Sequence, residues 1–423
     1  MATAGQIDRE VWLDAPALCR PVQVGWLSRR PSRTGDIIAF AYTTLWLDGA
    51  MGIAPFAIDG NLPLIEGWQY ARKGAGEVSP AFEDSSPDRW GRLLMDRREA
   101  ARARRDGEKP RGLRAWDYLM GVDDDSRMGA LRLRDPDTGA WLASGQPATP
   151  PITDLRRLEN IAERVESGAP LTTDEDNRWL MQLVAPGASL GGARPKAGYR
   201  DADGSLWLAK FPGRDDGHDV GLWEYITCKL AVAAGIVMPP ARLLDLSPRG
   251  HTFAVKRFDR SAGERSCFAS AYTLLDAEHS EDHSYLDIAR VIEEEGAQGQ
   301  IAADLQQLFR RVVFNVLIGN RDDHLRNHGF LRHRTGWALS PAYDINPNTT
   351  SDSHVLALDA ADPTPDTEHV MGSAAHYQLS PERAAAIEAE VRHVVGKWPA
   401  VARAHGAKRA EIERMDAVID PQR

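Results

Sequence analysis

Cysteine and long hydrophobic runs are scarce in this sequence, and each scarcity excludes a class of protein. Cys19, Cys228 and Cys267 are the only cysteines in 423 residues, and no CxxC pair occurs. An odd, scattered set fits neither a disulfide framework nor a zinc site and indicates a reducing compartment. The longest apolar run, residues 230–238, is far too short to span a membrane. The first residues include early acidic side chains and no apolar core, unlike a signal peptide, so we expect a cytoplasmic protein.

Basic residues are too few for a general nucleic-acid binder. Lys and Arg number 51 against 61 Asp and Glu, and the net charge is -10. Contacts to phosphate need a local excess of Lys and Arg, which leaves only local patches to consider. Seven arginines lie between Arg89 and Arg105. A solvated helix face explains that stretch, and a surface facing DNA or a partner protein is the alternative.

The first 150 residues are typical of a mixed unit of strands and helices. Residues 22–27 and 36–42 have strand-like composition, and Ser86-Pro87 is typical of a helix cap followed by a first-turn proline. A hairpin is expected around Asp137-Thr138-Gly139. The proline-rich segment 144–154 then predicts a domain boundary.

Beyond residue 150 the pattern predicts first a mixed and then a mainly helical region. Helices are expected near 154–166 and 173–183, followed by a glycine-rich loop at 186–192 and a hairpin that turns at Asp203-Gly204. A further helix ends at Gly235, and residues 251–260 resemble a strand. The remaining residues are mainly helical, and the final helix begins at Ser380-Pro381.

Lys210 lies in the predicted strand SLWLAKF, which is apolar on both of its faces. Such a strand is normally buried, and a buried lysine is costly unless it is paired. Glu224, in the helix that follows, is a candidate partner, as in kinases that hold ATP phosphates with a lysine and a helix glutamate. The alternative places Lys210 at the exposed end of the strand, with its ammonium in water.

The stretch PGASLGGARPKAG, residues 186–198, combines glycines with Ser189, Arg194 and Lys196. Glycines let backbone N–H groups approach phosphate oxygens, and the basic side chains supply opposite charge. It is not a Walker A loop, because GxxxxGK[ST] is absent. An ordinary glycine-rich loop is the alternative.

The stretch NVLIGNRDDHLRNHGFL, residues 315–331, carries the most informative motif. The periodicity predicts a helix over 301–319 that ends at Gly319. Asp322 and Asn327 then reproduce the D-x-x-x-x-N spacing of the protein-kinase catalytic loop, in which the Asp accepts the proton of the attacking hydroxyl and the Asn holds magnesium. A hairpin of residues 329–332 and 337–339 follows, and Asp344 stands where kinases place their metal-binding aspartate.

Two other interpretations of this stretch are possible. His324 and His328 are four residues apart, as in a zinc-protease helix, but Leu325 replaces the required Glu and the pair follows a helix-ending glycine. A solvated loop would explain the charged residues, though not their register with Asp344.

The sequence resembles the HipA family of toxin kinases over nearly its whole length. FEDSSPDRWGRLL and AWDYLMGVDDDSRMGALRL resemble the N-terminal region of that family, and SLGGARPK, LAKFPGRDD, VKRFDR, GNRDDHLRN and PAYDI resemble its kinase core. The resemblance implies an α+β, bilobal protein-kinase-like fold with an extra N-terminal α/β subdomain and a mainly α-helical C-lobe. Residues 1–150 would form the N-terminal subdomain, 151–260 the kinase N-lobe and 261–423 the C-lobe.

The resemblance also implies an ATP- and Mg²⁺-dependent Ser/Thr protein kinase. Asp322 would be the catalytic base, and Asn327 and Asp344 would hold magnesium. The ATP-binding residues would be Ser189, Gly191, Gly192, Ala193, Lys196, Lys210, Arg257, Phe258 and Asp259. The last three, residues 257–259, would line the adenine hinge. Ser189 also matches the loop serine that the family autophosphorylates, which ejects the loop and inactivates the enzyme. Pro195 departs from the best-known member and lacks an N–H, so it offers phosphate one backbone donor fewer.

The family implies particular partners as well. Its members pair with a small helix-turn-helix antitoxin of the HipB type and reach operator DNA mainly through it, and the best-known substrate is an aminoacyl-tRNA synthetase. A catalytically silent kinase fold that acts as an antitoxin-bound co-repressor is the alternative function. A small-molecule phosphotransferase would use the same side chains.

Overall fold

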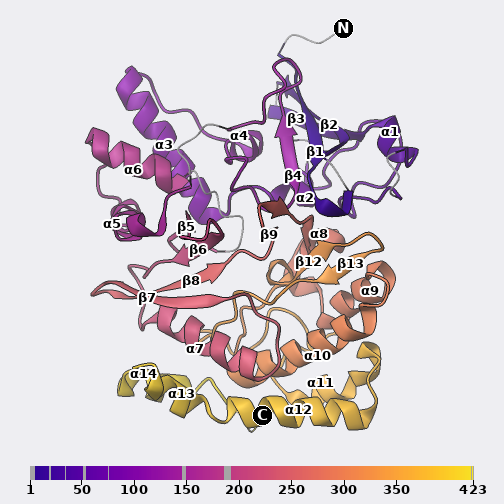
Figure 1. The fold of residues 1–423 in the computed structure, drawn as a ribbon, viewed down its shortest axis with the longest axis vertical. Coiled ribbons are helices and arrows are strands. Elements are labelled where there is room, and N and C mark those ends of the chain that lie inside the picture. The colour runs from indigo at the N-terminus through magenta and orange to yellow at the C-terminus, as the bar shows by residue number, and fades with distance from the viewer. Residues whose placement is uncertain are drawn as a thin grey trace. The chain divides into compact units, whose positions relative to one another are not determined.

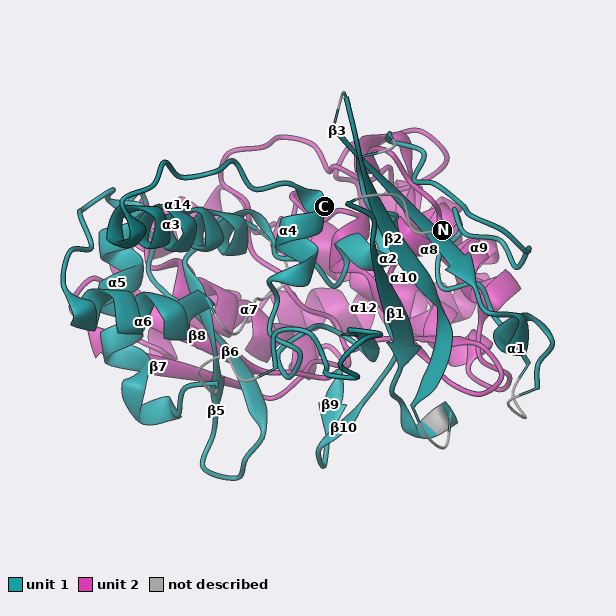
Figure 2. Ribbon diagram, turned by 90° about the horizontal axis from the view of Figure 1, so that it is seen from above, with its two compact units in different colours: residues 1–215, 259–269 teal, residues 216–258, 270–423 magenta. Residues whose placement is uncertain are grey.

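The computed structural model describes residues 5–18, 21–33, 35–50, 54–74, 76–144, 149–184, 192–420 and 422. The chain divides into two compact units, coloured separately in Figure 2: unit 1 is Met1–Asp215 with Asp259–Ala269, and unit 2 is Asp216–Phe258 with Ser270–Arg423. Both units mix helices and strands, as the α+β prediction requires (Figure 1). The predicted division into 1–150, 151–260 and 261–423 does not coincide with the two units and stays a prediction.

Unit 1 contains a four-stranded antiparallel sheet with the strand order β3-β2-β1-β4. Its strands are β1 (Ile7–Leu13), β2 (Val22–Ser32), β3 (Gly35–Tyr42) and β4 (Leu131–Arg134). The composition predicted β2 and β3, although β2 extends further than expected. The composition did not predict β1, because the strand contains charged residues. Two of them form ion pairs in the structure, Arg9 with Asp135 and Glu10 with Arg134. The predicted hairpin around 137–139 is present as a single bridge between Arg134 and Trp141.

The helices of unit 1 confirm two predictions and correct a third. They are α1 (Thr44–Leu47), α2 (Pro80–Glu83), α3 (Arg89–Asp106), α4 (Ala115–Met120), α5 (Leu155–Glu166) and α6 (Asp174–Val184). Of these, α5 and α6 match the expected helices. The predicted cap at Ser86 is wrong: the Ser86 hydroxyl donates to the Phe82 carbonyl at 2.8 Å and so belongs to the turn after α2. Asp88 caps α3 instead and accepts from the Gly91 N–H at 2.8 Å.

Two of the seven arginines of α3, Arg102 and Arg105, form ion pairs among the described residues. Arg102 alone pairs with Glu99 at 3.0 Å, with Asp106 at 3.1 Å and with Glu108 at 2.9 Å. Ion pairs of this kind on an exposed helix are typical of a solvated face. For these two arginines they favour the solvated-face interpretation over a surface for DNA.

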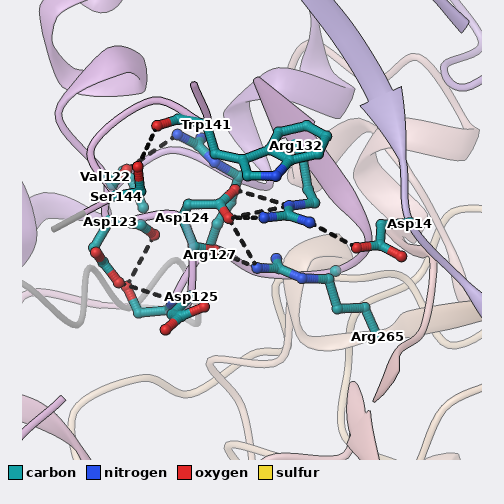
Figure 3. Close-up of polar contacts among 12 residues, drawn as sticks. Asp14, Val122, Asp123, Asp124, Asp125, Arg127, Arg132, Trp141, Ser144 and Arg265 are labelled. Atoms are coloured by element: carbon teal, nitrogen blue, oxygen red, sulfur yellow. Dashed lines mark hydrogen bonds and ion pairs between the residues drawn. The ribbon is translucent and has the colours of Figure 1, made fainter. Parts of the chain in front are cut away.

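A cluster of ion pairs explains why residues 259–269 belong to unit 1 (Figure 3). The buried Asp124 carboxylate accepts hydrogen bonds from the Arg132 guanidinium and lies 3.4 Å from Arg265. Arg265 also donates to the Asp124 carbonyl at 2.6 Å, while Arg132 reaches Asp14 at 2.8 Å and stacks 3.7 Å above the Trp141 ring. Buried charges are tolerated when paired in this way. The cluster therefore ties this short segment to the sheet of unit 1.

The remaining strands of unit 1 form two hairpins. The first joins β5 (Lys196–Arg200) to β6 (Leu206–Lys210), as predicted, with Gly204 at a φ of +82° in the turn. The second joins β9 (Arg260–Ser261) to β10 (Glu264–Arg265). β11 (Phe268–Ser270) runs across the boundary of the two units.

Unit 2 is mainly helical and is built around α10. Its strands are β7 (Ala241–Ser247), β8 (Gly250–Lys256), β12 (Gly329–Arg332) and β13 (Trp337–Leu339). Its helices are α7 (Val220–Ala233), α8 (Ala271–Leu274), α9 (Tyr285–Glu295), α10 (Ile301–Ile318), α11 (Thr367–Gly372), α12 (Pro381–Val395), α13 (Trp398–Ala404) and α14 (Arg409–Asp416). Residues 312–318 of α10 are all buried, and α10 packs against α9, α11 and α12. In the part of the chain that the structure describes, no helix has the length and apolar character to cross a membrane.

Gly319 ends α10 as the sequence predicted. It adopts a φ of +74°, and its N–H donates to the Val316 carbonyl at 3.3 Å. A Cβ at this position would lie 2.5 Å from Val418 Cγ1 and 2.8 Å from the Val418 carbonyl oxygen. Only glycine meets both the left-handed conformation and this close approach. The chain can therefore turn directly from the buried helix into the predicted catalytic loop.

Substituting Gly319 should separate backbone strain from crowding. We expect Gly319→Ala to lower the free energy of unfolding by about 2–4 kcal/mol, because left-handed strain and overpacking add. Gly406→Ala is the matched control, since Gly406 has a φ of +85° and open space around it, and it should cost only about 1 kcal/mol. Urea unfolding of both variants checks this, and equal losses would contradict the crowding at Gly319.

Candidate functional site

The elements around the predicted catalytic loop occur in the predicted order within unit 2. α10 ends at Ile318, the 3-10 turn Leu325–Asn327 lies inside the loop, and β12 and β13 pair as an antiparallel hairpin. Asp344 follows β13 in an irregular segment. The order helix, loop, hairpin and aspartate is therefore confirmed at the level of secondary structure.

Asp322 and Asp344 lie close enough for their charges to interact. The pKa of Asp322 is raised, first because burial of the carboxyl disfavours its charged form. His324 opposes this shift, while the negative charges of Asp344 and Asp323 add to it. Asp322 is nevertheless an exposed residue, so its carboxyl is partly desolvated and still accessible. A carboxylate with a raised pKa is a stronger proton acceptor.

The backbone at Asp344 is strained and held by its neighbours. Its φ of 57° lies in the left-handed region, which is uncommon for a residue other than glycine. The adjacent Tyr343 donates its hydroxyl to the Arg326 carbonyl at 2.7 Å, and its ring stacks on Phe258 with 5.4 Å between centroids. Such strain persists where the surroundings fix it and is common at functional sites. Through Tyr343, these contacts connect Asp344 to the predicted catalytic loop and to Phe258 of the predicted hinge.

Asn327 has an amide oxygen that is suited to a cation. The residue is buried, and its Nδ2 donates a long hydrogen bond of 3.4 Å to the Asp322 carbonyl. Its Oδ1 is buried as well and has no hydrogen-bond partner among the described residues. A buried oxygen without a partner is costly unless a ligand satisfies it. Magnesium takes oxygen ligands of this kind, with one or two carboxylates, so Asn327 and Asp344 fit it.

Asp323, directly after Asp322, is the centre of a buried polar network that the sequence did not reveal. Its Oδ2 accepts from the Tyr285 hydroxyl at 2.6 Å and from Asn315 Nδ2 at 2.9 Å, and lies 2.7 Å from His328 Nε2. Burial alone would raise the pKa of Asp323, but attraction to His328 and the hydrogen bonds from His328 and Tyr285 lower it. The motif spacing singled out Asp322, and nothing in the sequence separates a buried from an exposed aspartate at adjacent positions.

The two histidines of the loop do not resemble a zinc-protease pair. His324 precedes the 3-10 turn in an extended conformation, and His328 is buried against Asp323. Among the described residues, no group of three or more His, Cys, Asp or Glu side chains is arranged to hold a metal on its own. The zinc interpretation therefore has no support in this loop.

Two predicted phosphate-binding lysines lie opposite each other in unit 1. Lys196 of β5 pairs in register with Lys210 of β6, so both side chains project from the same face of the hairpin. Both residues are buried, at 2% and 7% exposure, which rules out the alternative of Lys210 at an exposed strand end. Like charges that face each other are unfavourable, so the arrangement calls for nearby negative charge.

Asp88 supplies part of that negative charge and was not predicted. Its Oδ2 lies 2.7 Å from Lys196 Nζ, and the indole N–H of Trp90 donates to the Lys196 carbonyl at 2.9 Å. The pKa of Asp88 is raised, first by burial, although attraction to Lys196 opposes the shift. The two residues are 108 positions apart, and no local pattern links them. From the sequence, Asp88 could have been recognised only as a helix cap that accepts from the Gly91 N–H, and not as the partner of Lys196.

The other predicted site residues have less specific surroundings. Ser189 and Gly191 lie outside the described residues, and Gly192 and Ala193 are exposed. Gly192 has a φ of +85°, and its carbonyl lies 3.4 Å from Lys196 Nζ. Glu224 is buried on α7 of unit 2, whereas Lys210 belongs to unit 1, and the ion pair between them stays a prediction. Arg257 is half-buried.

Asp259 has its carboxylate engaged within unit 1. Its Oδ2 accepts from the Gly129 N–H at 2.8 Å and from the Arg260 guanidinium at 2.6 Å, and the residue is fully buried. Arg260 also donates to the Gly129 carbonyl at 3.0 Å. The side chain therefore anchors the segment after the predicted hinge, and a role of Asp259 in nucleotide binding stays a prediction.

Comparison with known proteins identifies a family domain in this chain. Residues 188–398 match the family described as the HipA-like C-terminal domain. Over 160 residues, 34% of this chain, the sequence is 31% identical to Y4dM of Sinorhizobium fredii, which is named as a candidate kinase, and the match covers 38% of that protein. Over 265 residues, 54% of this chain, it is 24% identical to the serine/threonine-protein kinase toxin HipA of Shewanella oneidensis, and the match covers 59% of that protein. The chain thus spans less than two thirds of either relative.

The fold resembles a solved structure over nearly its full length. The match is a chain in the complex of the Shewanella oneidensis toxin–antitoxin system HipA, HipB and its operator DNA, with a TM-score of 0.64 at 16% sequence identity. It covers 97% of this chain and 94% of that one. At this identity the likeness concerns the fold alone. Together with the matched family domain, it shows that the chain belongs to the HipA family.

Proposed function

We propose that the chain is an ATP- and Mg²⁺-dependent Ser/Thr protein kinase and the toxin of a HipBA-like toxin–antitoxin module. The observation that carries the proposal is the arrangement of the loop in unit 2. Asp322 is accessible, and its pKa is raised, in part by the negative charge of Asp344. Asn327 has a buried oxygen without a partner among the described residues. These are the side chains that phosphoryl transfer from a nucleotide needs in a kinase-type catalytic loop.

Each side chain has a separate task in this proposal. Bound ATP–Mg²⁺ would supply the phosphoryl group and the charge that balances it. Asp322 orients the acceptor hydroxyl and takes its proton, which its raised pKa favours. Asn327 and Asp344 hold the cation, while Lys196 and Lys210 provide positive charge for the phosphates. Arg257, Phe258 and Asp259 line the adenine, Glu224 pairs with Lys210, and the overall fold is a bilobal kinase with an extra N-terminal subdomain.

The glycine-rich loop would regulate the enzyme. We propose that Ser189, with Gly191, Gly192 and Ala193, approaches the nucleotide and that Ser189 is itself phosphorylated. A dianionic phosphate on this loop would compete with ATP for the positive charge of Lys196. Lys196 is already held by Asp88, so its ammonium is in place for either anion.

The partners in this proposal follow from the solved relative. That structure contains HipB and operator DNA, and we propose a helix-turn-helix antitoxin of that type for this chain, with DNA reached mainly through it. The net charge of -10 supports indirect rather than direct DNA binding. The protein substrate would be a translation-related protein such as an aminoacyl-tRNA synthetase.

A catalytically silent co-repressor is the second candidate function. It would keep the fold and the antitoxin but bind no nucleotide productively. A ligand that binds only the folded state must raise the melting temperature, so the absence of any shift with ATP–Mg²⁺ would favour this candidate. A small-molecule phosphotransferase would label a metabolite rather than protein.

Self-labelling with radioactive ATP tests the proposed activity. We expect the parent protein to label itself at Ser189 and Asp322→Asn to lose labelling by about 100-fold or more, because the proton acceptor is gone. Ser189→Ala should remove the label while leaving transfer to other proteins. Asp137→Asn, an exposed aspartate in a turn of unit 1, is the matched control and should label as the parent does. Equal labelling by Asp322→Asn and the parent would overturn the assignment of the base.

The charge interaction between Asp322 and Asp344 can be measured without any activity. We expect Asp344→Asn to lower the pKa of Asp322, because a repelling charge is removed, though not to the ordinary value of 3.8, because burial is the larger cause. NMR titration of ¹³C-labelled aspartate carboxyls measures this, with Asp322→Asn assigning the signal. An unchanged pKa would mean that the two carboxylates do not share a site.

The proposed role of Lys210 predicts a selective loss of nucleotide binding. We expect Lys210→Met to weaken ATP–Mg²⁺ binding by about 10-fold to 100-fold, the usual range for one charge-assisted contact. Lys229→Met, at an exposed position on α7, should bind ATP as the parent does. Isothermal titration calorimetry measures both, and unaltered binding in Lys210→Met would remove this lysine from the nucleotide site.

A further inference from the structure

The catalytic loop is closed by a bond between two of its own side chains. Asp323 directly follows Asp322, and His328 directly follows Asn327. His328 Nε2 lies 2.7 Å from Asp323 Oδ2, so a single contact joins positions five residues apart. Each member of this bond is one residue removed from a predicted functional side chain. The separation of the proton acceptor from the cation ligand therefore depends on it.

The same carboxylate also attaches the loop to two helices of unit 2. Oδ2 of Asp323 accepts from the Tyr285 hydroxyl of α9 at 2.6 Å and from Asn315 Nδ2 of α10 at 2.9 Å. The Tyr285 ring meets the His328 imidazole edge to face, with 5.6 Å between centroids at 89°. Asn315 in turn accepts from Asn320 Nδ2 at 3.2 Å. The loop is thus held by Asp323 near its start, by His328 at its end, and by the contacts to α9 and α10.

We propose that Asp323 and His328 form a staple that positions Asp322 and Asn327 for phosphoryl transfer. The proposal rests on the proposed kinase function and names two positioning residues beyond it. Neither Asp323 nor His328 would touch the substrate, because both are only 3% exposed. A second role as a base is unsuited to Asp323, since three donors already converge on its Oδ2 and no acceptor hydroxyl could reach it.

The electrostatics of the staple favour rigidity. An ionised carboxylate is costly to bury unless several donors satisfy it, and the lowered pKa of Asp323 keeps it ionised at neutral pH. Hydrogen bonds to a charged acceptor are stronger than neutral ones, and a fully satisfied buried network admits few alternative arrangements. Loss of one donor should loosen the loop before it unfolds the unit. Displacing reacting groups by about 1 Å can slow a reaction by about 100-fold.

Substitutions at His328 separate positioning from simple stability. His328→Phe fills the space without a donor, whereas His328→Gln keeps an N–H donor near the position of Nε2. We expect His328→Phe to lower the maximal rate of self-labelling by about 10-fold to 100-fold with little change in the half-saturating ATP concentration. His328→Gln should restore the rate to within a few-fold of the parent. A role in stability alone would lower the melting temperature of both variants and leave the maximal rate of the folded protein unchanged.

Tyr285→Phe provides a milder test in case His328→Phe does not fold. It removes only the hydroxyl that donates to Asp323 and should slow labelling by several-fold. Tyr377→Phe is its matched control, a buried tyrosine of unit 2 whose ring packs on Phe309 at 5.3 Å, and it should label as the parent does. Equal rates for the two variants would overturn the proposal.

Hydrogen exchange distinguishes failure of the staple from failure of the proposed function. Amides of residues 320–329 should exchange at least about 10-fold faster in His328→Phe than in the parent, and at the parental rate in His328→Gln. A parent that does not self-label would refute the kinase proposal, yet exchange would still decide whether the staple holds the loop. Unchanged exchange in His328→Phe would refute the staple, whatever the activity.

Discussion

The buried carboxylate of Asp323 is the interaction on which the candidate site depends. It gathers donors from α9, from α10 and from the end of the catalytic loop on one oxygen atom. A charge in the interior is stable only with such partners, so the three segments must meet in one arrangement. Asp322 directly precedes Asp323, and Asn327 directly precedes His328. Beside this network, Asp322 is accessible with a raised pKa, and Asn327 has an amide oxygen without a partner among the described residues.

Unit 1 contains buried positive charges, which also require partners of opposite charge. Lys196 and Lys210 face the same side of one hairpin, although two buried cations repel each other. Asp88 at the start of α3 holds Lys196, so the N-terminal part of the chain contributes directly to the surroundings of a predicted phosphate-binding residue. The ion-pair cluster of Asp124, Arg132 and Arg265 likewise fixes the segment that follows the predicted hinge. Both contacts join the first 150 residues to later segments of unit 1.

Local patterns predicted the parts of the site that lie close together in sequence. Helical periodicity and Gly319 located α10, and the hairpin of β12 and β13 was predicted as well. The roles of Asp322, Asn327 and Asp344 stay predictions. The pairing of Asp88 with Lys196 could not be predicted, because tertiary packing brings together residues 108 positions apart. The sequence also could not predict that Asp323 is buried while Asp322 is exposed, because two adjacent aspartates are the same type of residue. The strand β1 was missed because its charged residues lower strand propensity until neighbouring strands pair with them.

The central claim is that Asn327 and Asp344 hold a divalent cation beside Asp322. The most direct measurement is the affinity of Mn²⁺ in the presence of a non-hydrolysable ATP analogue, followed by electron paramagnetic resonance in the parent and in Asn327→Leu. Leucine has the same branching as asparagine and removes the buried oxygen, so the account predicts Mn²⁺ binding weakened by about 10-fold or more in a protein that still folds. The same Mn²⁺ affinity in both proteins would contradict it.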